Sequence, residues 1–185
     1  DEKAMCNTLN AAKDVDGISL ASLAAVFTDA PDGFPPCTAA ACVAILEHYK
    51  VPITGKHVVV IGRSLVVGKP VSMMLLRRNA SVTICHSRTE NLQEISRSAD
   101  IVICATGRAR AYGREYFRPG QTVLDVGINF DVHGKLCGDV DFDEVEPIVD
   151  AITPVPGGVG TVTTSMTMQH TVAAAEAQLK ESLKG

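Results

Sequence analysis

Residues 62–70 carry glycines and basic side chains at spacings that suit a phosphate group. Gly62 and Gly68 bracket most of the segment, with Arg63 after the first glycine and Lys69 after the second. Glycine lets a backbone approach a pyrophosphate closely, and a helix that begins there offers unpaired N–H groups and a partial positive charge. The segment therefore indicates nucleotide binding, although a strand–helix–strand crossover without any ligand gives a similar local pattern.

Two common phosphate motifs do not fit this segment. The fingerprint Gly-x-Gly-x-x-Gly is incomplete, because only Gly62 and Gly68 are present. A P-loop is excluded, because five residues separate these glycines and Pro70 follows Lys69 where serine or threonine should bind magnesium. The turn is thus compatible with a nucleotide without matching either motif.

Alternating strands and helices must position these residues. Runs of β-branched and apolar residues predict strands at 57–61, 81–85, 101–105, 122–127 and 151–155. Helical spacing predicts helices at 2–12, 39–49, 71–76, 89–97 and 161–184. Residues 128–140 read as a β-excursion with a hairpin tip at 132–135. This order predicts an α/β fold, a Rossmann-like parallel sheet with helices on both faces.

Two helices carry additional sequence signals. Thr38 is a candidate N-cap for the helix at 39–49. The last helix carries one continuous apolar stripe, formed by Met168, Val172, Ala175, Leu179 and Leu183.

Ligands of such a sheet bind where its parallel strands end. The predicted strand ends carry glycines and polar residues, in the segments 62–64, 85–87, 105–107 and 126–129. Their convergence on one edge of the sheet predicts the nucleotide site there.

The residues after the second strand distinguish between two dinucleotides. NAD sites usually carry an acidic residue about 20 positions after the glycine turn, whereas this sequence has His86, Ser87 and Arg88 there and no carboxylate. A hydroxyl and a guanidinium suit a 2′-phosphate, and Arg63 can reach the same place. The pattern favours NADP over NAD. Arg63 and Arg88 also fit ordinary surface charges, and His86 fits an orienting residue better than an acid–base catalyst.

Composition excludes several classes of partner. The 185 residues suffice for one domain with helical extensions, and a formal net charge of −4 indicates neither nucleic acid nor an anionic membrane. No apolar run approaches the roughly 18 residues of a membrane span, and the first residues do not resemble a targeting peptide. Six basic residues gather around the glycine turn and suit a small anion, namely Lys56, Arg63, Lys69, Arg77, Arg78 and Arg88. A solvated helix face explains Arg77 and Arg78 as well.

The cysteines indicate neither disulfides nor a metal site. The six cysteines form no C-x-x-C pair, and no histidine lies beside them at metal-ligand spacing. We therefore expect buried free thiols, no structural metal and a reducing compartment, the cytoplasm.

Seven ordered motifs of this sequence resemble those of the bifunctional methylenetetrahydrofolate dehydrogenase/cyclohydrolase family. They are KDVDG at 13–17, PCT at 36–38, GRSLVVGKP at 62–70, NASVTICHSRT at 79–89, DVGIN at 125–129, GDVDF at 138–142 and ITPVPGGVG at 152–160. They occur in the family's order and span almost the whole chain.

The resemblance implies an NADP-binding Rossmann domain that closes a cleft against a folate-binding domain. The implied reaction moves a hydride from 5,10-methylenetetrahydrofolate to NADP, and water then opens the methenyl product to 10-formyltetrahydrofolate. The implied domains are residues 1–50, a remnant of the folate domain with a linker helix, residues 51–160, the NADP-binding domain, and residues 161–185, a helix that packs back on the first domain. A homodimer through the Rossmann domain is also implied, with residues 128–140 offering an edge strand.

The resemblance also implies roles for particular residues. The cofactor phosphates would contact Gly62, Arg63 and Ser64, with Arg63 and Ser87 near the 2′-phosphate, and the nicotinamide end would contact Thr38, Ile128 and Thr163. On the folate side, Asp16 would hydrogen-bond the pterin ring, and the cleft wall would include Pro156, Gly157 and Gly158. Two alternatives stay open, because the paired glycines also suit a tight turn and Asp16 a turn that ends a helix.

The sequence departs from the family at the catalytic pair. The family's Tyr-x-x-x-Lys pair and its Gln-Leu-Pro-Leu segment are absent from this sequence. Residues 39–41 are alanines where proline and glycine are usual, and Thr161 replaces a proline, where it is expected to act as an N-cap. The main hypothesis is the cofactor-binding part of a dehydrogenase/cyclohydrolase. The alternatives are a non-catalytic NADP-binding module and an unrelated Rossmann dehydrogenase.

Overall fold

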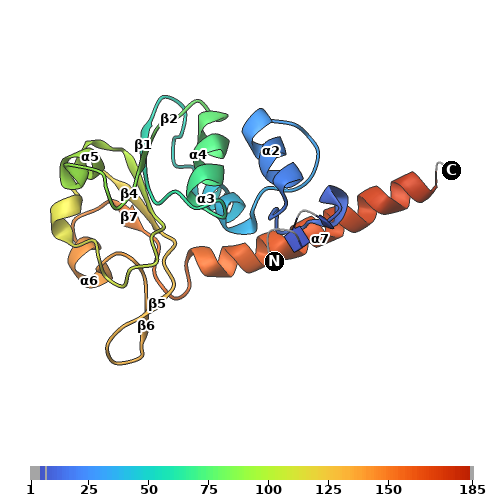
Figure 1. Ribbon diagram of the computed structural model, residues 1–185. Helices are drawn as coiled ribbons and strands as arrows, with labels where there is room; N and C mark the ends of the chain where they lie inside the picture. The colour runs from blue at the N-terminus through green and yellow to red at the C-terminus, as the bar shows by residue number, and fades with distance from the viewer. Residues whose placement is uncertain (1–4, 7, 184–185) are drawn as a thin grey trace.

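A parallel sheet, covered by helices and extended by one long C-terminal helix, forms the fold in the computed structural model, which describes residues 5–6 and 8–183 (Figure 1). The strands are β1 (His57–Ile61), β2 (Ser81–Cys85), β3 (Ile101–Cys104), β4 (Thr122–Asp125), β5 (Asn129–Phe130), β6 (Leu136–Cys137) and β7 (Ala151–Ile152). The helices are η1 (Ala11–Lys13), α2 (Leu20–Thr28), α3 (Cys37–His48), α4 (Gly68–Leu76), α5 (Leu92–Ser98), η2 (Arg114–Tyr116), α6 (Phe142–Val145) and α7 (Val159–Ser182). Of the helices predicted at 2–12 and 161–184, residues 2–4, 7 and 184 lie outside the described residues.

Five strands form one parallel sheet in the order β2-β1-β3-β4-β7. The register pairs Ile61 with both Cys85 and Cys104, and Cys104 with Asp125. Strands β2, β1, β3 and β4 therefore end side by side. The residues that follow them form one edge of the sheet, which we call the carboxyl edge. The predicted α/β parallel sheet is confirmed, and β1 and β2 have the predicted bounds. The excursion at 128–140 contains the antiparallel pair β5–β6.

Helices cover both faces of the sheet because its central strands are apolar on both sides. Val58 and Val60 of β1 share one core with α3, α4 and the start of α7. Val59 and Ile61 share the opposite core with Phe117 and with Val145 of α6. This double burial explains why the strand reads as a continuous β-branched run rather than an alternating one.

The long helix α7 packs along α3 near its start and runs past the N-terminal segment toward its end (Figure 1). Its 24 residues span roughly 36 Å. The predicted apolar stripe stays outside both cores, since Met168, Val172, Leu179 and Leu183 are 59 to 78% exposed. The stripe does not make α7 a membrane helix, because none of the helices in the described part of the chain combines the length and hydropathy of a bilayer span.

Two predicted N-caps are wrong. Helix α3 begins at Cys37 after Pro36, so Thr38 lies inside the first turn. The proline ring already fixes φ at a value close to the helical one, and the helix starts without a side-chain cap. Helix α7 begins at Val159 after Gly158, so Thr161 is likewise an interior residue.

Two glycines let the turn between β1 and α4 fold back on the sheet. Gly62 has a φ of +135°, and a Cβ there would overlap the carbonyl oxygen of Ala105, which follows β3. Gly68 begins α4, and a Cβ there would overlap the carbonyl of Gly62. The start of α4 is therefore seated on the end of β1, which places its N–H groups at the carboxyl edge.

We predict that Gly68→Ala lowers the free energy of unfolding by about 3 kcal/mol, because the added methyl overpacks a backbone contact that cannot shift cheaply. Gly160→Ala is the matched control, since Gly160 also lies in the first turn of a helix but its Cβ would meet only Ile128 Cδ1 at 3.8 Å. Urea unfolding of both variants measures the difference. Equal stabilities would contradict the proposed close approach.

Candidate functional site

The glycine turn is closed by Ser64. Its hydroxyl oxygen accepts the N–H groups of Val67 at 3.0 Å and Gly68 at 3.4 Å, and its carbonyl accepts the N–H of Lys69 at 3.0 Å. This capping explains why α4 begins at Gly68, three residues before the predicted start. The bonds from Val67 and Gly68 use the lone pairs of the Ser64 hydroxyl, so its proton is left to donate outward.

The turn after β2 lies next to the glycine turn. The N–H of Gly62 donates to the carbonyl of Cys85 at 2.9 Å, so the segments after β1 and β2 leave the sheet together. Arg63 and Ser87, the residues predicted at the 2′-phosphate, are both exposed on this edge. His86 is committed locally, because its Nδ1 accepts the N–H of Arg88 at 3.2 Å. This geometry agrees with an orienting rather than an acid–base role.

A buried carboxylate organises the loop after β3. Asp139, which is fully buried, accepts the N–H groups of Thr106, Gly107 and Arg108 at 2.5, 3.1 and 2.9 Å. It also accepts the Thr106 hydroxyl at 2.9 Å and the side-chain amide of Asn129 at 2.9 Å. One side chain therefore fixes the segment after β3 against the segment after β4.

A second buried carboxylate holds the first in place. Asp125, the last residue of β4, accepts the N–H groups of Gly127, Asp139 and Val140 at 3.0, 2.9 and 2.9 Å. Burial, with a smaller contribution from the nearby Asp139, raises the pKa of Asp125 to about 6, against the three N–H groups that lower it. Gly138 is required beside it, because a Cβ there would overlap the carboxylate.

Sequence reasoning did not assign these two aspartates a role. They stand in the DVGIN and GDVDF motifs, which were recognised only as a resemblance. A usable signal was present, since Asp125 ends an apolar strand, Gly127 follows it, and Asp139 directly follows Gly138.

A hollow of about 550 Å³ lies between the end of β4 and the start of α7, and we call it the α7 hollow. The structure brings four predicted residues together in its lining, namely Ile128, Pro156, Gly157 and Gly158. Thr163 lies one turn into α7, with its hydroxyl donating to the Val159 carbonyl at 3.0 Å. Thr38 is half-buried in the first turn of α3, which packs along α7.

Asp16 lies away from the α7 hollow but on the side of Thr38, because the thiol of Cys37, the residue before Thr38, donates to the carbonyl of Val15, the residue before Asp16, at 3.2 Å. It is exposed in the turn between η1 and α2, and the preceding carbonyl of Val15 contacts His170 in the middle of α7. The predicted site residues thus form two groups, one along the carboxyl edge and one beside the middle of α7. Among the described residues, no cluster of His, Cys, Asp or Glu could hold a metal ion.

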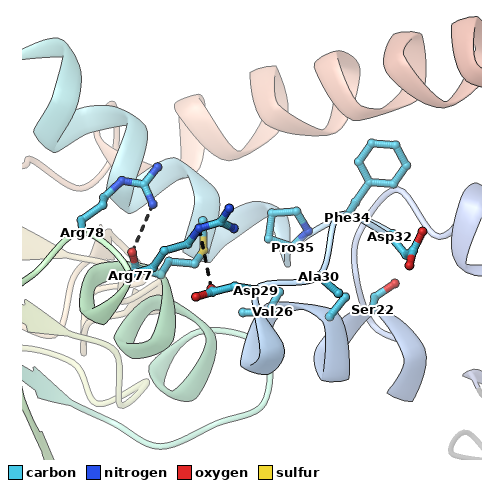
Figure 2. A pocket seen from close by; sticks show the side chains of 12 residues that line it. Ser22, Val26, Asp29, Ala30, Asp32, Phe34, Pro35, Arg77 and Arg78 are labelled. Carbon is cyan, nitrogen blue, oxygen red and sulfur yellow. Dashed lines mark hydrogen bonds and ion pairs between the residues drawn. The ribbon is translucent and has the colours of Figure 1, made fainter.

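The arginines at the end of α4 do not join the carboxyl edge. Figure 2 shows them beside another hollow, of about 520 Å³, between α2 and the end of α4. Arg77 pairs with Asp29 at 3.7 Å, and Arg78 pairs with Glu47 at 2.6 Å. Of the predicted basic cluster, Arg77 and Arg78 therefore lie at the opposite end of α4 from the glycine turn.

We predict that Asp139→Asn lowers the free energy of unfolding by roughly 2–3 kcal/mol, because an amide group would face backbone N–H donors that now meet a charged acceptor. Asp131→Asn is the matched control, since only one oxygen of that exposed hairpin carboxylate accepts N–H groups, from His133 and Lys135. Chemical unfolding measures both, and hydrogen exchange at residues 106–108 should quicken only in Asp139→Asn. Unchanged exchange there would refute the assigned role.

Comparison with known proteins agrees with this geometry. The sequence model of the tetrahydrofolate dehydrogenase/cyclohydrolase NAD(P)-binding domain matches residues 36–179. The bifunctional protein FolD of Carboxydothermus hydrogenoformans is 56% identical over 178 residues, which are 95% of this chain and 62% of that protein. FolD 1 of Desulfitobacterium hafniense is 53% identical over 96% of this chain and 63% of its own length. The chain therefore spans less than two thirds of these relatives.

Solved structures give the same result. The bifunctional FolD enzyme of Campylobacter jejuni superposes with a TM-score of 0.93 at 37% identity, covering 96% of this chain and 63% of that one. The FolD of Trypanosoma brucei, solved with NADP cofactor and an inhibitor, superposes with a TM-score of 0.90 at 35% identity, covering 97% of this chain and 63% of that one. The chain therefore belongs to the tetrahydrofolate dehydrogenase/cyclohydrolase family and carries that family's NAD(P)-binding domain.

Proposed function

We propose that this chain is the NADP-binding part of an enzyme that oxidises 5,10-methylenetetrahydrofolate to the methenyl form and hydrolyses that product to 10-formyltetrahydrofolate. One observation carries the choice of cofactor. The edge formed by Arg63 and Ser87 presents a guanidinium and a hydroxyl without a carboxylate, and both side chains are exposed where β1 and β2 end. A carboxylate there would repel a 2′-phosphate, whereas these groups donate to it.

The carboxyl edge offers a fitting cradle for the diphosphate. Gly62 and Gly68 leave no room for a Cβ against the neighbouring backbone, so the turn lies close on the strand ends, and the Ser64 hydroxyl has a proton to donate. The N-terminus of α4 adds a partial positive charge. NADP would accept the hydride, while these residues bind and orient it. Its nicotinamide end would run toward Ile128, Thr38 and Thr163.

The substrate side would be built from Asp16 and from the wall of the α7 hollow. Asp16 would hydrogen-bond the pterin ring of the folate, and Pro156, Gly157 and Gly158 would bound the cleft. Asp16 is exposed although its turn is tightly held, which supports a role in binding over a purely structural turn. The alternative that the paired glycines serve a tight turn is also supported, because Gly157 has a φ of +99°.

We propose the same domain division that the family resemblance implies. Residues 1–50 would belong to the folate domain and its linker, residues 51–160 to the NADP-binding domain, and residues 161–185 would pack back on the folate domain. The exposed stripe on α7 supports this arrangement, because Met168, Val172 and Leu179 are 59 to 66% exposed and the relatives are longer than this chain.

One sequence feature favours a second function, that of a non-catalytic NADP-binding module. The Tyr-x-x-x-Lys pair expected of the folate domain is absent from this sequence, which favours a non-catalytic NADP-binding module for the chain taken alone. The third alternative, an unrelated dehydrogenase, is excluded by the family membership.

Self-association is a further part of the proposal. The β5–β6 excursion exposes Phe130 and Val132, at 70% and 95%, and a homodimer through the Rossmann domain would cover them. A folate is the proposed substrate, and we infer a cytoplasmic location without a nucleic-acid or membrane partner.

We predict that this chain binds NADP more tightly than NAD, and that Ser87→Glu reverses the preference. The new carboxylate should weaken NADP binding by roughly ten- to a hundredfold, because it replaces a donor with a repelling charge. Arg77→Ala is the control, since Arg77 lies at the far end of α4. Isothermal calorimetry measures all three proteins. Equal affinity of the wild type for both dinucleotides would contradict the proposed cofactor.

We also predict that the intact protein, this chain with the folate domain that the family resemblance implies, reduces NADP in the presence of 5,10-methylenetetrahydrofolate, whereas this chain alone does not. The catalytic pair accounts for the difference. Absorbance of the reduced nicotinamide measures both. An inactive intact protein would refute the enzyme proposal, and turnover by this chain alone would refute the role of the missing pair.

A further inference from the structure

One backbone carbonyl joins three segments that the sequence keeps far apart. The oxygen of Val15 accepts the ring Nδ1–H of His170 at 2.8 Å and the thiol of Cys37 at 3.2 Å. His170 comes from the middle of α7 and is 8% exposed, while Cys37 begins α3 and is fully buried. We call these three groups the Val15 node.

The chemistry of the node fixes which group donates. A carbonyl oxygen only accepts, so the proton of a neutral His170 lies on Nδ1. The Cys37 sulfur lies 3.5 Å from that same nitrogen and cannot donate to it, whereas the Val15 oxygen lies 3.2 Å from the sulfur and accepts its proton. Burial raises the pKa of the Cys37 thiol, which keeps that proton in place.

The turn that contains Val15 is held on its other sides too. Gly17 has a φ of +63°, and a Cβ there would overlap the backbone of Phe34 and Pro35. The ring of Phe34 in turn lies 4.9 Å from the His170 ring, centroid to centroid. The turn is thus clamped between the segment before α3 and the histidine of α7.

The buried carboxylate of Asp14 closes the same turn from within. It accepts the N–H groups of Ile18 at 3.1 Å and Ser19 at 2.8 Å, and the Ser22 hydroxyl at 2.7 Å. Burial alone would raise the pKa of Asp14, but the hydrogen bonds from Ser19, Ser22 and Ile18 bring it below its usual value. Asp16, between these fixed neighbours, is the exposed carboxylate of the turn.

We infer that His170 is a positioning residue, which aims Asp16 at the folate by holding the carbonyl of Val15, and this inference rests on the proposed function. Two members of the node, Val15 and Cys37, directly precede Asp16 and Thr38 in the sequence. His170 also lies seven residues along α7 from Thr163, which is about 10 Å of rigid helix. One helix therefore sets the substrate contact and the nicotinamide end relative to each other.

Two substitutions at position 170 separate this role from general packing. Asn places an N–H donor on the same δ position as the histidine nitrogen, so His170→Asn should keep the bond to Val15. His170→Leu replaces the ring with an apolar side chain of similar size that has no donor, and it leaves the carbonyl to the weak thiol alone. His48→Leu, at an exposed histidine near the end of α3, is the control.

The first test uses the intact protein and separates KM from kcat. His170→Leu should raise KM for 5,10-methylenetetrahydrofolate about tenfold and leave KM for NADP within about twofold, whereas His170→Asn and His48→Leu should match the wild type. Unchanged folate KM in His170→Leu, equal rises for both substrates, or failure of His170→Asn to rescue would each overturn the inference. A wild type without folate turnover would instead refute the proposed function, and the inference with it.

The second test needs no activity and uses this chain. Amide hydrogen exchange at residues 15–18 should quicken about tenfold in His170→Leu and stay at the wild-type rate in His170→Asn. Equal exchange in the two variants would overturn the positioning role even if KM changed. If His170→Leu fails to fold, His170→Gln, which moves the donor one bond further out, replaces it with the same expected direction in both tests.

Discussion

The carboxylate of Asp139 is the constraint on which the carboxyl edge of the sheet depends. Three consecutive N–H groups follow β3 in a loop that no regular structure pairs, and this buried side chain accepts all of them. The carboxylate itself is fully buried, and burying such a group without hydrogen-bond donors is costly. The loop can therefore take this shape only while the excursion after β4 returns to bring Asp139 beneath it, and Asp125 fixes that return by accepting the N–H groups of Asp139 and Val140.

The glycine turn depends on the same arrangement. Gly62 lies against the carbonyl of Ala105, the residue directly before the loop that Asp139 holds. The parallel register fixes the ends of β1, β2 and β3 relative to one another, because Ile61 pairs with both Cys85 and Cys104. A nucleotide would meet a surface made of backbone from three strand ends, whose shape is set by buried carboxylates that need not touch it.

The sequence predicted much of this framework from local patterns. The bounds of β1 and β2 were correct, because each strand is a short β-branched run that ends at a turn. The edge of the sheet was also placed correctly, since parallel strands put all their carboxyl ends together. The family resemblance then supplied predictions that such patterns cannot make, such as the roles of Asp16 and Thr163, and these roles stay predictions.

Backbone preferences at the helix starts and contacts between distant segments account for what was not predicted. The N-cap roles of Thr38 and Thr161 failed because Pro36 and Gly158 already set the helix starts. Arg77 and Arg78 follow the glycine turn closely in sequence, but nine helical residues carry them roughly 13 Å away. The backbone partners of the Asp139 and His170 side chains lie 31–33 and 155 residues from them in the chain. The local signal at Asp139 could therefore mark the residue but not these contacts.

The most direct test of this account is a map of amide chemical shifts in this chain as NADP is added. The account predicts shifts confined to the glycine turn at 62–68, the turn at 86–88, the loop at 106–108 and the first turns of α3 and α7, with the hollow beside Arg77 and Arg78 unaffected. Shifts centred on that hollow, or none at the glycine turn, would contradict it.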